Sequence, residues 1–303
     1  MLKRALAKLE PLDPDHLPRE LKAIKTVRRF YPGVTQVACF DTAFHRHMPT
    51  VAQQYPLPRK LWRAGVRRFG FHGLSYEFLI HELSGVAGAR AAHSRVIIAH
   101  LGSGASMTAI RGGKSIETTM GFTPTGGLMM STRSGDLDPG VIRYLVREKG
   151  LSSSALSDLV NKRAGLVGVS GISSDLRVLF AQSENNPHAA EAIELFCYEA
   201  KKNLGALAAV LGGIDTLIFT AGIGENMPAI RRRICQHLEF LGIRLDFRRN
   251  ERNAAIISRA DSPVTVRVMK TNEELMIARH TRDLVGSSAS VKSRGAGKQG
   301  RTR

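Results

Sequence analysis

The sequence is poor in cysteine, in aromatic residues and in long apolar runs. It holds 3 cysteines and 1 tryptophan among 303 residues, and aromatic residues make up 6% of the chain. The cysteines lie far apart and form no CxxC pair, which excludes a disulfide framework and favours a reducing compartment such as the cytoplasm. No run of about 18 apolar residues occurs, so no membrane span is predicted. The N-terminus also lacks the apolar core of a secretory signal.

Acidic residues are scarce relative to basic ones. The chain has 26 Asp and Glu against 44 Lys and Arg, and a formal net charge of +18. Residues 286–303 are small, polar and basic, and their composition predicts a disordered tail. Clusters such as Arg231-Arg232-Arg233 are interpreted as solvated basic surface. Aromatic residues do not alternate with the basic ones, and this argues against nucleic acid as a partner.

The remaining composition is that of an ordinary globular protein, with 43% hydrophobic and 23% charged residues. Apolar runs, glycine-rich turns and helical patterns alternate along the chain, which indicates an α/β fold. We expect strands at 34–40, 96–99, 106–110, 115–119, 216–220 and 263–269. We expect helices at 76–83, 141–149, 152–160, 189–211, 228–241 and 272–284.

The stretch between Val96 and Pro139 is the most informative. His100 follows an apolar strand, and the sequence Gly102-Ser103-Gly104 then forces a turn into a returning strand. Such a turn leaves backbone N–H groups unshielded, and a histidine and a hydroxyl stand beside it, so it can receive phosphate oxygens. Further on, Arg133 stands among small residues, where its guanidinium could fork onto a phosphate. Neither a P-loop nor a dinucleotide fingerprint is complete here.

Two other strand ends carry candidate residues. Asp41 follows the predicted strand 34–40, where it could serve a metal or phosphate site or cap a turn. His45 and His47 alternate beyond it, but no further ligands stand at zinc spacing. After the predicted strand 216–220, a glycine loop (222–226) opens a predicted helix, an arrangement that can hold phosphate at a helix N-terminus.

Several motifs resemble those of the acetate and propionate kinase (acetokinase) family. HLGSGAS, GKSIETTMGFTPTGGLM and TRSGDLDP are similar to its central signature. VACFDTAFHRHMP, RRFGFHG, SGISSDLR, FTAGIGEN and TNEELMIAR agree with it in the same order, so the resemblance covers about residues 11–282. This family belongs to the acetate and sugar kinase/actin superfamily. The resemblance therefore implies duplicated ribonuclease-H-like (actin-like ATPase) domains, with the nucleotide in the cleft between them.

The activity implied by the resemblance is reversible phosphoryl transfer, in which ATP and acetate give ADP and acetyl phosphate with Mg²⁺. The acceptor carboxylate is already nucleophilic, so no strong general base is needed. The resemblance gives catalytic roles to Arg133, His100, His72, Asp41 and His16, the last only if three extra residues are allowed after Leu12. It assigns the nucleotide to His100, Gly102, Ser103, Gly104, Asp175, Leu176, Arg177, Gly222, Ile223, Gly224 and Asn226. It assigns the acyl pocket to Phe71 and Pro124, and the metal to Glu273 and Asp41.

The front of the family pattern has no counterpart in this sequence. Its opening strand, its asparagine–glycine–serine loop and its HRVVHGG stretch are absent, so the resemblance implies that the first domain is largely missing. Ser103 replaces an asparagine, and Leu74 and Tyr76 replace the threonine and second histidine of HGTSH. The expected domains are a remnant of the N-terminal acyl-binding domain (1–43), the nucleotide-binding domain (44–272), a C-terminal helix closing the cleft (273–285) and a disordered basic tail (286–303).

Three interpretations stay open at this point. In the first, the chain is a short-chain carboxylate kinase for acetate or propionate and ATP, with a homodimer and a separate chain that carries the missing part as its expected partners. It could instead be a truncated nucleotide-binding remnant with weak or no turnover. A third interpretation is a basic nucleic-acid-binding module that reuses the fold, which would require salt-sensitive binding.

Overall fold

The computed structural model describes residues 2–7, 9–10 and 17–296. The chain divides into two compact units, one formed by Met1–Phe40 with Asn272–Arg303 and the other by Asp41–Thr271. The larger unit contains the whole β-sheet. Within the described residues, no helix is long and apolar enough to cross a membrane.

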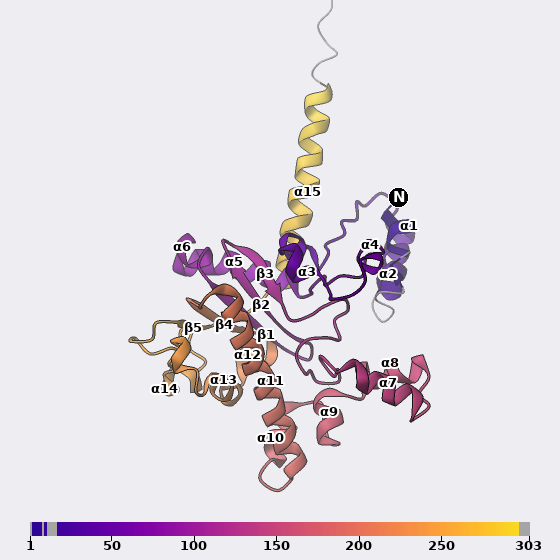
Figure 1. Ribbon diagram of the computed structural model, residues 1–303. Helices are drawn as coiled ribbons and strands as arrows, with labels where there is room; N and C mark the ends of the chain where they lie inside the picture. The colour runs from indigo at the N-terminus through magenta and orange to yellow at the C-terminus, as the bar shows by residue number, and fades with distance from the viewer. Residues whose placement is uncertain (1, 8, 11–16, 297–303) are drawn as a thin grey trace, which may run out of the picture. The chain divides into compact units, whose positions relative to one another are not determined.

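A five-stranded mixed sheet forms the centre of the larger unit (Figure 1). Its strands follow the order β3-β2-β1-β4-β5. Strand β1 pairs antiparallel with β2 and parallel with β4, and β5 continues the parallel part. A meander joined by a helical crossover to parallel strands is the predicted ribonuclease-H-like arrangement, and this prediction is confirmed. The strands are β1 (Val96–Leu101), β2 (Ala105–Arg111), β3 (Lys114–Thr118), β4 (Thr216–Thr220) and β5 (Thr265–Val268).

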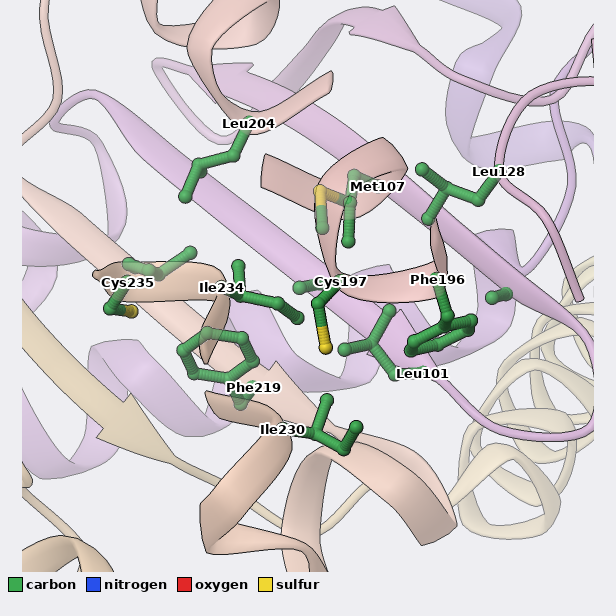
Figure 2. Close-up of a cluster of buried hydrophobic side chains, with 14 of the residues drawn as sticks. Leu101, Met107, Leu128, Phe196, Cys197, Leu204, Phe219, Ile230, Ile234 and Cys235 are labelled. Atoms are coloured by element: carbon green, nitrogen blue, oxygen red, sulfur yellow. The ribbon is translucent and has the colours of Figure 1, made fainter. Parts of the chain in front are cut away.

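Strand β1 is buried along its whole length because helices cover both faces of the sheet. Its residues Ile97, Ala99 and Leu101 share one apolar core with helix α11 (Pro187–Leu211) and helix α13 (Pro228–Cys235) (Figure 2). The alternate residues face the opposite side, where helix α5 (Gly73–Ala87) packs, as the hydrogen bond between Ser75 and His100 shows. Residues on this second face belong to the candidate site.

Helix α11 makes the crossover between β3 and β4. The side chain of Asn186 caps its first turn by accepting from the N–H groups of His188 and Ala189, and Gly212 ends it in the left-handed conformation. The predicted apolar face of this helix is confirmed as buried, with Ala192, Phe196, Ala200, Leu204 and Leu207 all in the core.

The other helices belong either to the smaller unit or, as short segments, to the connections of the larger unit. In the smaller unit the structure describes α1 (Leu2–Ala7), α2 (Leu17–Phe30) and α15 (Glu273–Ala296). The larger unit further contains η2 (Ala43–His47), α3 (Thr50–Gln53), α4 (Arg59–Arg63), α6 (Ala89–Ala92), α7 (Pro139–Arg147), α8 (Ser153–Lys162), α9 (Gly165–Ser170), α10 (Leu176–Gln182), α12 (Ala221–Asn226), η3 (Glu239–Leu241) and α14 (Phe247–Glu251).

The structure corrects two predictions in the smaller unit. The predicted strand 34–40 is wrong, because these residues join no sheet. A segment of strand-forming residues makes a strand only where a neighbouring strand is available to pair with it. The disordered tail predicted for 286–303 is wrong as far as Ala296, since helix α15 continues to that residue. Each residue added to an existing helix gains a hydrogen bond, so small polar residues need not end it. Residues 297–303 lie outside the described part of the chain.

Two further corrections concern the chain after β4. The expected glycine loop 222–226 is the short helix α12. The helix predicted for 228–241 ends at Cys235, because Gln236 leaves the helical backbone with φ −62° and ψ 130°. The periodic apolar residues beyond it belong to the separate turn η3. The apolar residues keep helical spacing from α13 into η3, so the sequence pattern did not reveal that the helix ends between them.

Candidate active site

The glycine hairpin between β1 and β2 is the point on which the candidate residues converge. The N–H of Gly102 donates to the carbonyl oxygen of Gly104 at 3.0 Å and closes the turn. A Cβ atom at Gly104 would lie 3.4 Å from Nε2 of His72 and 3.5 Å from Nη1 of Arg133. Three motifs far apart in the sequence therefore place a hairpin, an imidazole and a guanidinium around one small volume.

Two histidines form the wall behind this volume. The rings of His72 and His100 are stacked, with centroids 4.1 Å apart and planes 12° apart. The hydroxyl of Ser75 lies 2.9 Å from Nδ1 of His100, and the hydroxyl of Ser106 lies 2.8 Å from Nδ1 of His72. Each histidine thus has its Nδ1 engaged by a serine, while its Nε2 faces the hairpin. A Cβ atom at Gly102 would lie 3.9 Å from Nε2 of His100.

The environment keeps both imidazoles neutral at neutral pH. Burial lowers the pKa of His72 from 6.5 to about 4, and the positive charge of Arg133 acts in the same direction. Burial also lowers the pKa of His100 well below its usual value, with the adjacent His72 contributing. Desolvation disfavours the charged form of a base, so a neutral stacked pair is the stable state. Neutral rings can donate or accept one hydrogen bond at Nε2.

The loop that carries Arg133 is fixed to the hairpin. The N–H of Ser131 donates to the carbonyl oxygen of Ser103 at 3.2 Å, and Nη1 of Arg133 donates to the carbonyl oxygen of Pro124 at 3.3 Å. Gly165 has φ +63°, and a Cβ atom there would lie 2.8 Å from the carbonyl oxygen of Arg133. Only glycine allows helix α9 to begin so close to the loop. The guanidinium is therefore presented by a braced segment.

The two predicted acyl-pocket residues lie on either side of these groups. Pro124 contacts the guanidinium of Arg133 through its carbonyl oxygen. Phe71 immediately precedes His72 and packs against the apolar core of the larger unit. Its carbonyl oxygen receives a contact from Nε2 of His45 at 3.0 Å. The structure therefore brings both residues next to the candidate catalytic groups.

A cavity of about 840 Å³ opens beside the hairpin. Four segments line it: the hairpin residues 102–104, the arginine loop 131–133, residues 174–177 with Phe180, and residues of α12 with the start of α13. The structure thus gathers most of the predicted nucleotide residues around one hollow. Gly224 lies beneath the surface instead, where a Cβ atom would come within 3.3 Å of the backbone of Phe219, so its role is to let α12 pack closely on β4.

Asp175 and Arg177 form a local pair at one edge of this cavity. The side chain of Asp175 caps helix α10 by accepting from the N–H of Arg177 at 2.9 Å. The guanidinium of Arg177 returns to the same carboxylate at 2.6 Å. The hydrogen bond from Arg177 lowers the pKa of the Asp175 carboxyl. Both side chains are open to solvent and to any molecule in the cavity.

Helix α12, at the opposite edge, is held from below by Arg231. This side chain is fully buried, so the prediction of a solvated surface is wrong for this member of the basic cluster. Its guanidinium donates to the carbonyl oxygens of Gly224 and Glu225 at 2.9 and 3.0 Å. It also donates to Asn250 and Asn253. Burial lowers its pKa to about 10, so it stays charged.

Asp41 caps the turn before helix α5, which is one of the roles that the sequence allowed for it beside a metal or phosphate site. Its Oδ2 accepts from the N–H of His72 at 2.6 Å, and its Oδ1 accepts from the N–H of Leu74 at 3.3 Å. The carboxylate therefore fixes the backbone of His72, which has a positive φ of 58°. Glu273 begins helix α15 in the smaller unit. His16 lies outside the described residues.

Sequence reasoning missed the hydroxyl partners of the two histidines. Ser75 and Ser106 lie within the motifs HGLSY and HLGSGAS, yet neither was singled out. The hairpin register contained a signal for Ser106, because a turn centred on Ser103 places it directly opposite His100. Arg231 was also detectable, since it stands four residues after Met227 and four before Cys235, on the apolar face of α13.

Comparisons with known proteins agree with this geometry. A model of the acetokinase family matches residues 2–279. An acetate kinase of Rhodopseudomonas palustris (strain TIE-1) is 51% identical over 279 residues, which cover 91% of this chain and 69% of that protein. The crystal structure of Porphyromonas gingivalis acetate kinase superposes with a TM-score of 0.87 at 42% identity, covering 93% of this chain and 72% of that one. A propionate kinase structure from Francisella tularensis gives a TM-score of 0.87 at 35% identity, covering 91% and 71%.

Proposed function

Because this chain belongs to the acetokinase family, we propose that its hairpin, histidine pair and Arg133 form the site of phosphoryl transfer between ATP and a short-chain carboxylate. The activity is the reversible, ATP-dependent phosphorylation of acetate to acetyl phosphate. One observation carries the assignment of the site: Nε2 of His72 and Nη1 of Arg133 converge on Gly104 at the wall of a large cavity.

The chemistry needs positioning and positive charge more than covalent help. A phosphoryl group in transfer spreads negative charge over its equatorial oxygens. Arg133 supplies a fixed charge beside them, and the neutral His72 and His100 can add hydrogen bonds without a competing charge. Groups already held in place cost no reorganisation when charge develops, so they act most strongly in the transition state. The carboxylate acceptor attacks directly.

The cavity supports the placement of the nucleotide. Its volume of about 840 Å³ falls within the range of about 300–1,000 Å³ that is usual for small-molecule sites. The hairpin lies beside Arg133 and the two histidines, and α12 begins next to it, since a Cβ atom at Gly102 would lie 3.5 Å from Cβ of Ala221. Residues 174–177 and the rest of α12 line the remainder of the cavity. We therefore place the phosphates at the hairpin and the nucleoside between the other two segments.

We propose that Mg²⁺ accompanies the nucleotide, with Asp41 of the larger unit as one of its protein ligands; the metal role of Glu273 stays a prediction of the resemblance. Asp41 fits this role because, among the described residues, each of its carboxylate oxygens accepts one backbone N–H, which leaves lone pairs for a cation. Mg²⁺ usually takes one or two carboxylates together with phosphate oxygens and water. A magnesium ion bound in this way requires no cluster of three or more metal-binding side chains. No such cluster occurs among the described residues. When bound, the ion would neutralise charge on the phosphates.

The remaining implications of the resemblance stay predictions. These are the homodimer, the cytoplasmic location, the separate chain for the missing part and the choice between acetate and propionate. The nucleic-acid alternative gains no support, because Arg231 of the basic cluster is buried and satisfied instead of facing solvent.

Two measurements on the same preparation test the proposal. Calorimetry should detect ADP binding in the presence of Mg²⁺, and trapping with hydroxylamine should detect acetyl phosphate formed from ATP and acetate. Arg133→Ala should retain the first signal and lose the second. Absence of ADP binding at millimolar concentration from a folded protein would contradict the proposed nucleotide site.

A further inference from the structure

A chain of hydroxyl groups lies behind His72, on the side away from the cavity. The phenol oxygen of Tyr76 contacts Oγ of Ser106, and Oγ of Ser106 lies 2.8 Å from Nδ1 of His72. Tyr76 and Ser106 are both completely buried. None of the roles assigned above belongs to either residue, although both lie directly against the candidate catalytic ring.

The number of protons in this chain restricts their positions. A serine hydroxyl has a single proton, so Ser106 can donate to only one of its two neighbours. A phenol is more acidic than an aliphatic hydroxyl and its oxygen accepts more weakly, which makes Tyr76 the donor in the pair. Ser106 then accepts from Tyr76 and donates to His72. A ring nitrogen that accepts a hydrogen bond carries no proton, so the proton of the neutral imidazole is on Nε2.

We propose that Tyr76 and Ser106 are positioning residues that hold His72 in the Nε2–H tautomer. The ring then presents an N–H donor toward Gly104 and Arg133, where the transferred phosphoryl group is placed. The other tautomer would present a bare lone pair to an anion, which is repulsive. The catalytic consequence rests on the proposed function, whereas the tautomer itself does not.

The surroundings of His100 repeat this construction. Its Nδ1 contacts Oγ of Ser75, and that hydroxyl contacts Oγ1 of Thr271 at 2.7 Å. Both Nε2 atoms face the hairpin, since Nε2 of His72 would lie 3.4 Å from a Cβ atom at Gly104 and Nε2 of His100 would lie 3.9 Å from one at Gly102. The family pattern has a histidine where this chain has Tyr76. A tyrosine at this position adds a phenol hydroxyl, a strong donor, next to Ser106.

Nitrogen NMR on the whole chain, labelled with ¹⁵N-histidine at pH 7.5, tests the tautomer without any need for turnover. A protonated ring nitrogen resonates well upfield of a bare one, and the His72 signals are identified by their loss in His72→Asn. We expect a bare Nδ1 and a protonated Nε2 for His72. A protonated Nδ1 in the unaltered protein would overturn the proposal, whether or not any variant folds.

Variants test the cause. Tyr76→Phe removes the phenol hydroxyl that contacts Ser106, and Ser106→Ala removes the partner of Nδ1. In either variant the His72 signals should shift toward a mixture of the two tautomers. Ser115→Ala is the matched control, because its hydroxyl contacts Nδ1 of a different histidine, His45, at 2.8 Å. It should change the His45 signals alone. Unchanged His72 signals in both test variants would overturn the proposal.

Kinetics test the consequence. Ser106→Ala should lower kcat for acetyl phosphate formation about tenfold, with little change in KM for ATP. This is the low end of the effect of losing a hydrogen bond to a charged group, here the bond from His72 to the phosphoryl group. Ser115→Ala should keep the unaltered kcat. A purely structural defect would move KM and kcat together. A Ser106→Ala protein with shifted tautomer and unaltered kcat would overturn the link to catalysis. A chain without turnover would count against the proposed function and leave the NMR result intact.

Discussion

The rings of His72 and His100 stack at 4.1 Å although they come from different motifs and different elements. His72 precedes helix α5 and His100 lies in strand β1. His72 contacts Ser106 of strand β2, which pairs with β1, and His100 contacts Ser75 of helix α5. Two imidazolium ions could not pack in this way in a buried place, so the arrangement depends on both rings being neutral.

The buried His45 should make stability depend on pH. Burial lowers its pKa from 6.5 to about 4 in the folded protein. Between these values the unfolded chain binds a proton that the folded protein does not, so the free energy of unfolding falls as pH drops from about 6.5 toward 4. His45→Asn should flatten this dependence by about 1.4 kcal/mol per pH unit. Urea unfolding at several pH values measures it, and the exposed His188→Asn should match the unaltered protein.

Gly222→Val should abolish nucleotide binding without unfolding the protein. A Cβ atom at Gly222 has no heavy atom within 4 Å, and this glycine lines the cavity. The added side chain can therefore occupy the space that the nucleotide needs at no steric cost to the fold. Gly205→Val on helix α11 is the control, since that glycine is equally open and lies outside the cavity lining. Equal ADP affinity for both variants by calorimetry would refute this placement.

Arg133→Ala should lower acetyl phosphate formation by about 10³-fold while ADP affinity changes little, because an arginine beside the transferred group acts mainly on the transition state. Arg133→Lys should recover little, since a point charge cannot fork onto two oxygens. Arg163→Ala, which removes an exposed arginine paired with Asp158, should behave like the unaltered protein. An Arg133→Ala enzyme with full turnover would exclude this residue from the chemistry.

Arg231→Met should destabilise the larger unit by at least about 3 kcal/mol, because the carbonyl oxygens of Gly224 and Glu225 would lose a buried donor and each unsatisfied group costs about 1–3 kcal/mol. Arg231→Lys should be intermediate, since three donors cannot replace five. Arg232→Met is the neighbouring control, because Arg232 is exposed and lies over the ring of Phe247. Urea unfolding followed by circular dichroism compares the three, and similar stabilities would show that the buried network contributes little.

The sequence by itself determined the family, the α/β class and the elements whose pattern is local. Strands β1 and β4 consist mostly of consecutive apolar residues, which predicts strands that are covered on both faces. Helix α11 repeats apolar residues at helical spacing, which predicts one buried face. The glycine hairpin at 102–104 was equally clear, because its conformation depends on the residues in the turn itself.

Only the tertiary structure decided which residues share an environment. The sequence 34–40 has strand character but joins no sheet within the described part of the chain. Arg231 resembles its exposed neighbours in the sequence, but in the fold Asn250 and the carbonyl groups of Gly224 and Glu225 surround it. The tautomer of His72 likewise depends on Ser106, which a different element supplies. These properties arise from contacts between residues distant along the chain. Burial and hydrogen bonding determine them, and both exist only in the folded chain.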